Sequence, residues 1–177
     1  FVIGASVRGE VTLEVIEELR KKVTILSADV QGFIRIVHEG KLVSKDWPEK
    51  EKVLAMVDVL KTDAVEAELL TGKSDFRVAA RIIADFGPKE VVITHSNGLL
   101  VYDGNHFYET NFCPKQLIGR SGRGDTCIGS YVARRLNAPP PQAMIWAAAV
   151  TSLKMEAEGP FRRDIREVEE LIQKKYG

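Results

Sequence analysis

Hydrophobic and polar residues follow two alternating patterns along this chain. Short apolar runs predict strands at residues 1–4, 23–28, 57–60 and 90–94, and apolar residues spaced three or four apart predict helices between them. Such strand, helix, strand units build parallel sheets, so the pattern predicts an α/β fold. Two further pairs of short apolar segments surround turn residues and predict hairpins: 33–37 with 42–44, and 99–102 with 106–108.

The C-terminal third of the chain has a helical pattern. Residues 127–136 have apolar or small side chains at helical spacing, and residues 142–155 are apolar nearly all round. A helix that is apolar all round is buried on more than one face. Earlier in the chain, Thr12 and Asp75 precede amphipathic segments and are predicted to cap the helices that follow.

A glycine-rich turn leads into the helix predicted at 127–136. Three glycines lie within six residues, Gly119, Gly122 and Gly124, and Asp125 follows at once. The first N–H groups of a helix lack intrahelical acceptors, and the helix dipole adds positive charge there, so such a turn can bind an anion. Asp125 is then a base or a metal partner. Its alternative is a plain N-cap that accepts the N–H of Cys127 or Ile128.

Acidic residues follow two of the predicted strands. Asp29 comes directly after the second strand, where it either points into a ligand crevice or caps the turn at Gly32. Asp63 and Glu66 are three residues apart at a helix start. This spacing suits water-mediated Mg²⁺ binding, and it equally suits an N-cap with its capping-box glutamate. The spacing alone does not choose between these alternatives.

Composition and charge narrow the class of partner. The chain has 177 residues, which suits one domain, and 25 basic residues balance 25 acidic ones. This balance argues against a nucleic acid or a membrane surface as partner and favours a small molecule. Two cysteines, Cys113 and Cys127, are too few for a disulfide framework or a zinc site and fit a reducing compartment. Because no apolar run reaches membrane-spanning length, we expect a cytoplasmic protein.

Four motifs in order resemble the carboxyl-terminal half to two-thirds of a ribokinase-like (PfkB family) carbohydrate kinase. Residues 27–35 resemble the family's Asp-x-x-Gly-x-x-Arg segment, and residues 61–72 resemble Lys-x-Asn-x-x-Glu followed by Leu-x-Gly. Residues 92–98 resemble the strand and loop that flank ATP. The most specific match is 121–126, Ser-Gly-Arg-Gly-Asp-Thr, which is similar to the signature Thr-Gly-Ala-Gly-Asp-Thr/Ser.

The resemblance implies a three-layer α/β/α fold with a mainly parallel sheet. The chain starts within a predicted strand at Phe1, and we expect that the family's amino-terminal part, with its lid and sugar-binding residues, is missing. The resemblance also implies a role for each of the following residues: Asp125 as catalytic base; Gly122, Arg123 and Gly124 as the anion hole; Thr94, Ser96, Asn97, Gly98, Ser121 and Gly124 as ATP contacts; Glu66 and Asp63 as Mg²⁺ partners.

Four positions depart from the family pattern. Asp63 stands in place of an asparagine, and Gly119 stands where a carboxylate often helps to hold a monovalent cation. Arg123 replaces a small residue of the anion hole, where it either adds a positive contact to ATP or points to solvent. The loop at His95 and Ser96 lacks the usual glycine, so its nucleotide contacts have the weakest support.

Together these features predict an ATP-dependent kinase with Mg²⁺ that phosphorylates a hydroxyl of a small sugar, a nucleoside or a polyol such as inositol. The alternative is a non-catalytic nucleotide- or phosphate-binding module, or an inactive fragment. The sequence leaves open the substrate, the hydroxyl that is phosphorylated, the nucleotide preference, the monovalent cation and the formation of a homodimer.

Overall fold

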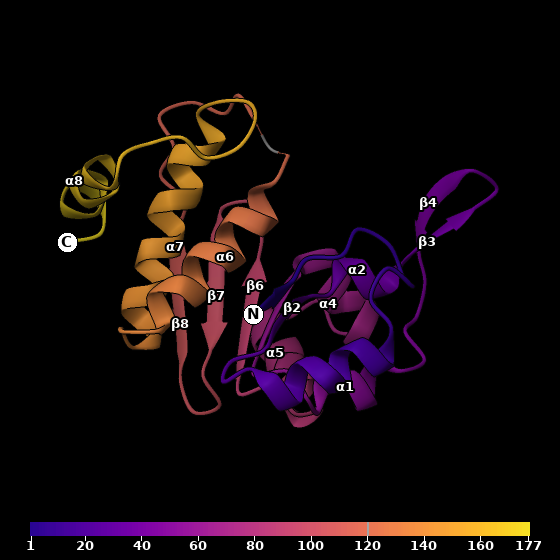
Figure 1. Cartoon of the computed structure of the whole chain (residues 1–177). Coiled ribbons are helices and arrows are strands. Elements are labelled where there is room, and N and C mark those ends of the chain that lie inside the picture. The colour runs from indigo at the N-terminus through magenta and orange to yellow at the C-terminus, as the bar shows by residue number, and fades with distance from the viewer. Residues whose placement is uncertain (120) are drawn as a thin grey trace. The chain divides into compact units, whose positions relative to one another are not determined.

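A computed structural model describes residues 1–119 and 121–177 (Figure 1). The described chain forms two compact units, Phe1–Thr94 with Tyr102–Phe107, and His95–Val101 with Tyr108–Gly177. Arg120, which belongs to the glycine-rich motif, lies outside the described residues. The single domain expected from the length of the chain stays a prediction.

The sheet is mixed and has six strands. Its strand order is β1-β2-β5-β6-β7-β8. In the first unit β1, β2, β5 and β6 pair in parallel, with Leu60 aligned to Ala28 on one side and to Val91 on the other. This confirms the parallel sheet expected from the alternating pattern. The strands of the sheet are β1 (Val2–Ile3), β2 (Ser27–Asp29), β5 (Val59–Asp63), β6 (Glu90–Thr94), β7 (Gly98–Tyr102) and β8 (Phe107–Asn111).

Several predicted strands have different limits in the structure, and β1 covers only Val2–Ile3 of the predicted segment 1–4. Residues 23–26 are not part of β2; Val23 instead ends the preceding helix by donating its N–H to the carbonyl of Leu19. β5 begins two residues later than predicted and continues to Asp63. The hairpin predicted at 33–37 and 42–44 is present as β3 (Arg35–His38) and β4 (Lys41–Ser44), which form a separate antiparallel pair. Residues 33 and 34 belong instead to the short helix Gln31–Ile34.

Side-chain capping fixes the start of only some helices of the first unit. Asp75 accepts hydrogen bonds from the N–H groups of Arg77 and Val78, which confirms the predicted cap. Thr12 occupies the predicted N-cap position before Leu13, although its side chain accepts no capping hydrogen bond. The helices of this unit are α1 (Leu13–Lys22), α2 (Gln31–Ile34), α3 (Lys50–Leu54), α4 (Ala64–Thr71) and α5 (Phe76–Asp85).

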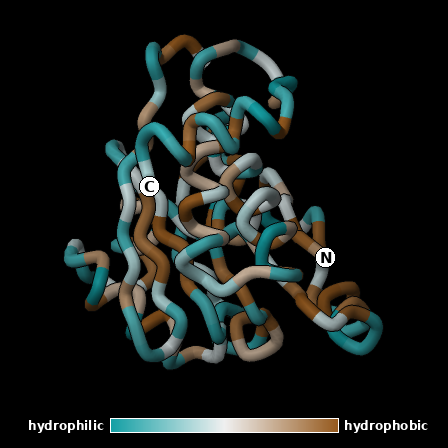
Figure 2. Tube along the Cα trace, turned by 90° about the vertical axis from the view of Figure 1, so that its left-hand side faces the viewer, coloured by the Kyte–Doolittle hydropathy of each residue, from teal (hydrophilic) through white to brown (hydrophobic). Residues whose placement is uncertain are grey.

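The second unit contains three longer helices, α6 (Arg123–Arg135), α7 (Pro140–Met155) and α8 (Ile165–Lys175). Every residue of α7 from 147 to 155 is buried, as its apolar sequence predicts, and α7 packs against both α6 and α8. Figure 2 shows how hydrophobic and hydrophilic stretches alternate along the chain. No helix within the described ranges combines the length and the apolar character needed to cross a bilayer.

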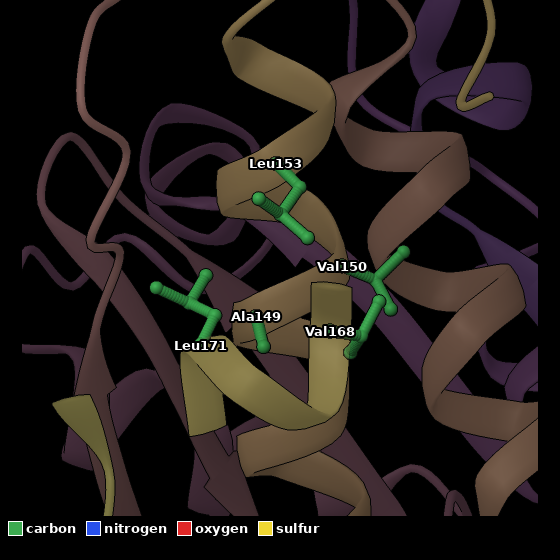
Figure 3. Close-up of a cluster of buried hydrophobic side chains, with 5 residues drawn as sticks. All are labelled: Ala149, Val150, Leu153, Val168 and Leu171. Carbon is green, nitrogen blue, oxygen red and sulfur yellow. The ribbon is translucent and has the colours of Figure 1, made fainter. Parts of the chain in front are cut away.

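A small apolar cluster joins α7 to α8 (Figure 3). Trp146 and Phe161 pack against its edge. A short amphipathic helix such as α8 is stabilised mainly by the packing of its apolar face. This cluster therefore provides most of the stabilisation that holds α8 against α7. The buried side chains of the cluster are Ala149, Val150, Leu153, Val168 and Leu171.

Truncating Leu171 to alanine is expected to lower the free energy of unfolding by about 2–4 kcal/mol, because the loss of a buried leucine leaves a cavity. Leu171 is only 9% exposed, whereas Leu136 at the end of α6 is 73% exposed. Leu136→Ala is therefore the matched control, with an expected change within about 0.5 kcal/mol. Urea unfolding followed by circular dichroism measures both, and equal losses would contradict the docking of α8.

Candidate functional site

The glycine-rich turn of the second unit ends at the residue that caps α6. Gly122 has a φ of +73°, occupies the N-cap position, and accepts the N–H of Thr126 at 3.0 Å. The helix therefore begins at Arg123, four residues earlier than its apolar pattern predicts. Asp125 lies inside the first helical turn and is exposed. The N-cap alternative for Asp125 is wrong, because Gly122 already holds that position.

The N–H groups at the start of α6 have no acceptor among the residues that the structure describes. The N–H groups of Gly122, Arg123 and Gly124 donate to no residue that the structure describes. These are the amides that a helix leaves without internal acceptors, and the dipole of the 13-residue helix adds positive charge beside them. The turn thus has the electrostatic character of an anion site, and Asp125 places one carboxylate at its edge.

Arg123 has a specific position that the sequence left open. Its guanidinium lies over the ring of Phe112, 6.0 Å from the ring centroid, and its side chain is half-buried. Phe112 in turn donates its N–H to the carbonyl of Asn97 at 2.7 Å. The arginine is therefore held at the helix start by an aromatic face rather than released to solvent.

The loop predicted to contact a nucleotide is a tight turn. The N–H of His95 donates to the carbonyl of Gly98 at 2.9 Å, and the N–H of Asn97 donates to Nδ1 of His95. Gly98 has no room for a side chain, since a Cβ there would lie 2.0 Å from the carbonyl oxygen of Thr110. The side chains of Ser96 and Asn97 are exposed. Their contact with a nucleotide stays a prediction.

His95 titrates below its usual range. Burial lowers the pKa of His95, and the nearby positive charge of Arg123 lowers it further, while Glu109 opposes both. The imidazole is therefore neutral at physiological pH and adds no charge to this loop.

In the first unit, Asp63 and Glu66 form the capping box of α4. Oδ1 of Asp63 accepts the N–H of Glu66 at 2.9 Å, and Oε2 of Glu66 accepts the N–H of Asp63 at 2.8 Å. This confirms the capping-box alternative for the pair. Thr94, which was predicted to contact ATP, ends β6 and is buried. Its hydroxyl donates to the carbonyl of Thr62.

A buried ion pair lies among the strand ends of the same unit. Nζ of Lys61 donates to Oδ2 of Asp29 at 2.9 Å, and Oδ1 of Asp29 accepts the N–H of Gln31, as the turn-cap alternative predicts. Burial raises the pKa of Glu66; the charge of Lys61 opposes this shift, and the carboxylates of Asp63 and Asp29 add to it. The sequence did not pair Lys61 with Asp29, since the two lie 32 residues apart.

The carboxylates of Asp63 and Glu66 restrict which metal ion could bind beside them. In the part of the chain that the structure describes, no three His, Cys, Asp or Glu side chains gather as a metal cluster. Oδ2 of Asp63 and Oε1 of Glu66 accept no hydrogen bond from any described residue. Two such oxygens fit an ion that keeps most of its water, as Mg²⁺ does, and do not fit zinc.

Replacing Glu66 with glutamine is expected to raise the free energy of unfolding at neutral pH. The raised pKa means that the folded state disfavours the charged carboxylate, and a glutamine oxygen still accepts the N–H of Asp63. The gain should shrink as the pH falls through the raised pKa and vanish below about pH 4, where both states of the wild type are protonated. Urea titrations from pH 8 to 4 test this, with the exposed Glu68→Gln as control. A gain that grew toward low pH would contradict the burial argument.

Sequence reasoning missed one buried charge in the second unit. Lys154 is 3% exposed and its Nζ donates to the carbonyl of Gly119 at 3.2 Å, next to the glycine-rich turn. The available signal was a lone lysine within the apolar segment 142–155.

The match to a family model spans most of the chain. The model that describes the pfkB family carbohydrate kinases matches residues 13–162, which include both the capping box and the glycine-rich turn. The chain belongs to the pfkB family of carbohydrate kinases.

Solved structures support this membership. This pfkB-family chain is 44% identical, with a TM-score of 0.89 over 96% of its length, to a pyrophosphate-dependent kinase of the ribokinase family complexed with a pyrophosphate analog and myo-inositol. It is 45% identical to such a kinase in a sulfate complex, with a TM-score of 0.88 over 95% of its length. It spans 61% and 60% of those two chains.

More distant relatives agree on the fold. Ribokinase from Arabidopsis thaliana, complexed with ribose and ATP, superposes with a TM-score of 0.74 at 23% identity, over 90% of this chain and 51% of that one. Cytidine kinase from Thermococcus kodakarensis is 34% identical over 85 residues, which are 46% of this chain and 31% of that protein. The ribokinase-like fold expected from the motifs is confirmed for this pfkB-family chain.

Proposed function

We propose that the protein transfers a phosphoryl group from pyrophosphate to a hydroxyl of a polyol, with myo-inositol as the first acceptor to test. The observation that carries this proposal is the start of α6, where Arg123 and Asp125 lie beside amides that donate to no described residue. The identity of 44–45% to kinases described as pyrophosphate-dependent supports the choice of donor.

Each part of the α6 start has a role in this transfer. Asp125 accepts the proton as the acceptor O–H bond breaks, and the acceptor oxygen forms a bond to the transferred phosphorus. The P–O bond to the leaving phosphate breaks, and that phosphate takes the electron pair. The amides of Gly122, Arg123 and Gly124 stabilise the charge on the transferred group, which is the main demand of phosphoryl transfer.

The choice of donor differs from the ATP expected from the motifs. Pyrophosphate has no nucleoside, so it does not require contacts from Ser96, Asn97 or Gly98. Arg123 stands in place of the family's small residue and adds a positive charge. A guanidinium binds phosphate oxygens strongly, so this charge favours a compact and highly charged donor such as pyrophosphate. ATP stays the second candidate donor, with Thr94, Ser121 and the 95–98 loop as its predicted contacts.

Magnesium fits the first unit of the chain. Glu66, together with Asp63, would hold Mg²⁺ largely through water. The capping box keeps both carboxylates at the carboxyl ends of the strands, which is where ligands bind in α/β folds.

A matrix of donors and acceptors tests the proposal. Pyrophosphate and ATP are each combined with myo-inositol, ribose and cytidine, and phosphorus NMR identifies the products. We expect phosphorylated inositol with pyrophosphate alone. Transfer to cytidine would favour the nucleoside acceptor of the Thermococcus relative. Binding of pyrophosphate without any product would favour a non-catalytic module.

A further inference from the structure

Lys154 is a buried cation that has no role in the phosphoryl transfer proposed above. Its side chain lies near the end of α7 and is 3% exposed. It forms no ion pair with any acidic residue in the described ranges, and its one hydrogen bond there is to the carbonyl of Gly119. Burial of an ammonium group without a negative partner costs free energy. A lysine at this place in an otherwise apolar stretch therefore indicates an interaction with a negatively charged ligand.

The end of α7 holds the first residue of the glycine-rich motif from several sides. The N–H groups of Ile118 and Gly119 both donate to the carbonyl of Met155, at 2.9 and 3.1 Å. Gly119 lies so close that a Cβ there would be 2.3 Å from the carbonyl oxygen of Ala157. The bond from Lys154 therefore adds to a set of contacts that fixes this residue three positions before the N-cap of α6.

The lysine also passes beside that N-cap. A Cβ built at Gly122 would lie 3.9 Å from Cε of Lys154. The ammonium, bound to the carbonyl of Gly119, therefore lies beside the turn whose amides donate to no described residue. Lys154, the helix dipole and Arg123 all place positive charge at the same turn.

We propose that Lys154 is a positioning residue for the phosphate donor. Its ammonium holds the Gly119 carbonyl and supplies, from within the protein, positive charge behind the amides that bind the donor. The inference rests on the proposed function. A lysine that only complemented the dipole at the end of α7 would need neither burial nor a bond to Gly119.

The charge of Lys154 favours donors in proportion to their own charge. A multiply charged pyrophosphate gains more from a buried cation than a sulfate dianion does, because the attraction scales with the product of the charges. An acceptor polyol is neutral and gains nothing from it. Loss of the lysine should therefore weaken pyrophosphate binding most, sulfate binding less, and the KM for the acceptor not at all.

Lys154→Met tests this role, because methionine matches the length and volume of the lysine stem without its charge. We expect an unchanged or higher Tm, together with a Kd for pyrophosphate raised about tenfold by calorimetry. Added ammonium or methylammonium ions should restore part of the affinity. Lys115→Met is the matched control, since the Lys115 side chain is exposed and the hydrogen bond of Lys115 to Glu156 is made by its backbone N–H.

The outcomes separate this inference from the function on which it rests. If the wild type neither binds nor uses pyrophosphate, the proposed function fails. If the wild type uses pyrophosphate and Lys154→Met binds it equally well, the inference is overturned. It is also overturned if the variant does not fold, or if donor and acceptor KM rise together, because each result assigns Lys154 a purely structural role.

Discussion

Asp125→Asn is expected to lower kcat by about 10²–10⁴-fold while the affinity for the donor stays nearly the same. The loss is the contribution of a general base, since asparagine has no basic oxygen to take the acceptor's proton. Stability should change little. Asp125 is exposed within the first turn of α6, and Gly122 rather than Asp125 caps that helix. Steady-state kinetics and calorimetric donor binding measure the two quantities on the same preparation.

The control for Asp125→Asn is the same exchange at an exposed aspartate elsewhere. Asp85 ends α5 in the other unit and is exposed. Asp85→Asn should leave kcat within about twofold of the wild type. If Asp125→Asn kept wild-type turnover, the base would have to be another group. If it lost donor affinity and turnover alike, the carboxylate would act in binding rather than in proton transfer.

Gly119→Ala is expected to reduce both stability and activity. The new Cβ would lie 2.3 Å from the carbonyl oxygen of Ala157 and 2.9 Å from Cα of Glu158, so backbone must move. Overpacking against backbone costs about 1–3 kcal/mol. The movement also displaces the carbonyl that Lys154 binds and the turn that leads to Gly122, and we expect kcat/KM to fall about 100-fold.

Gly129→Ala is the matched control for that substitution. Gly129 lies within α6, and a Cβ there meets no atom within 4 Å. Alanine at an open position inside a helix should raise the free energy of unfolding by about 0.5–1 kcal/mol and leave kinetics unchanged. Urea unfolding and donor-saturation kinetics are measured for both variants. Equal behaviour of the two would show that the close packing at Gly119 has no functional consequence.

Much of the site could be predicted from the sequence because its interactions join residues that lie a few positions apart in the chain. The capping box joins Asp63 and Glu66, which are three residues apart. The cap at Asp75 depends on the first turn of the helix that directly follows it. The glycine-rich turn was recognised as a helix start for the same reason. The N-cap position of Thr12 was predicted correctly, but its hydroxyl accepts no capping hydrogen bond, because an N-cap position does not by itself orient a hydroxyl toward the helix amides.

Strand limits and the start of α6 were less predictable. Residues 23–26 are apolar enough for a strand, but they lie between the end of α1 and the start of β2, whose parallel register with β5 begins at Ser27. The apolar pattern of α6 starts at Cys127, whereas its first turn is made of Arg123, Gly124 and Asp125, which carry no hydrophobic signal. Hydrogen bonding, not hydrophobicity, sets both limits.

By itself, the sequence determined the family, the parallel sheet, and the identity of the residues that precede and open α6. Short-range spacing carries that information. Only the tertiary structure decided which groups those residues meet: Lys154 at the Gly119 carbonyl and Lys61 on Asp29 are contacts across 35 and 32 residues. No periodic pattern encodes such pairs, because they form only when separate elements pack and bury their charges together.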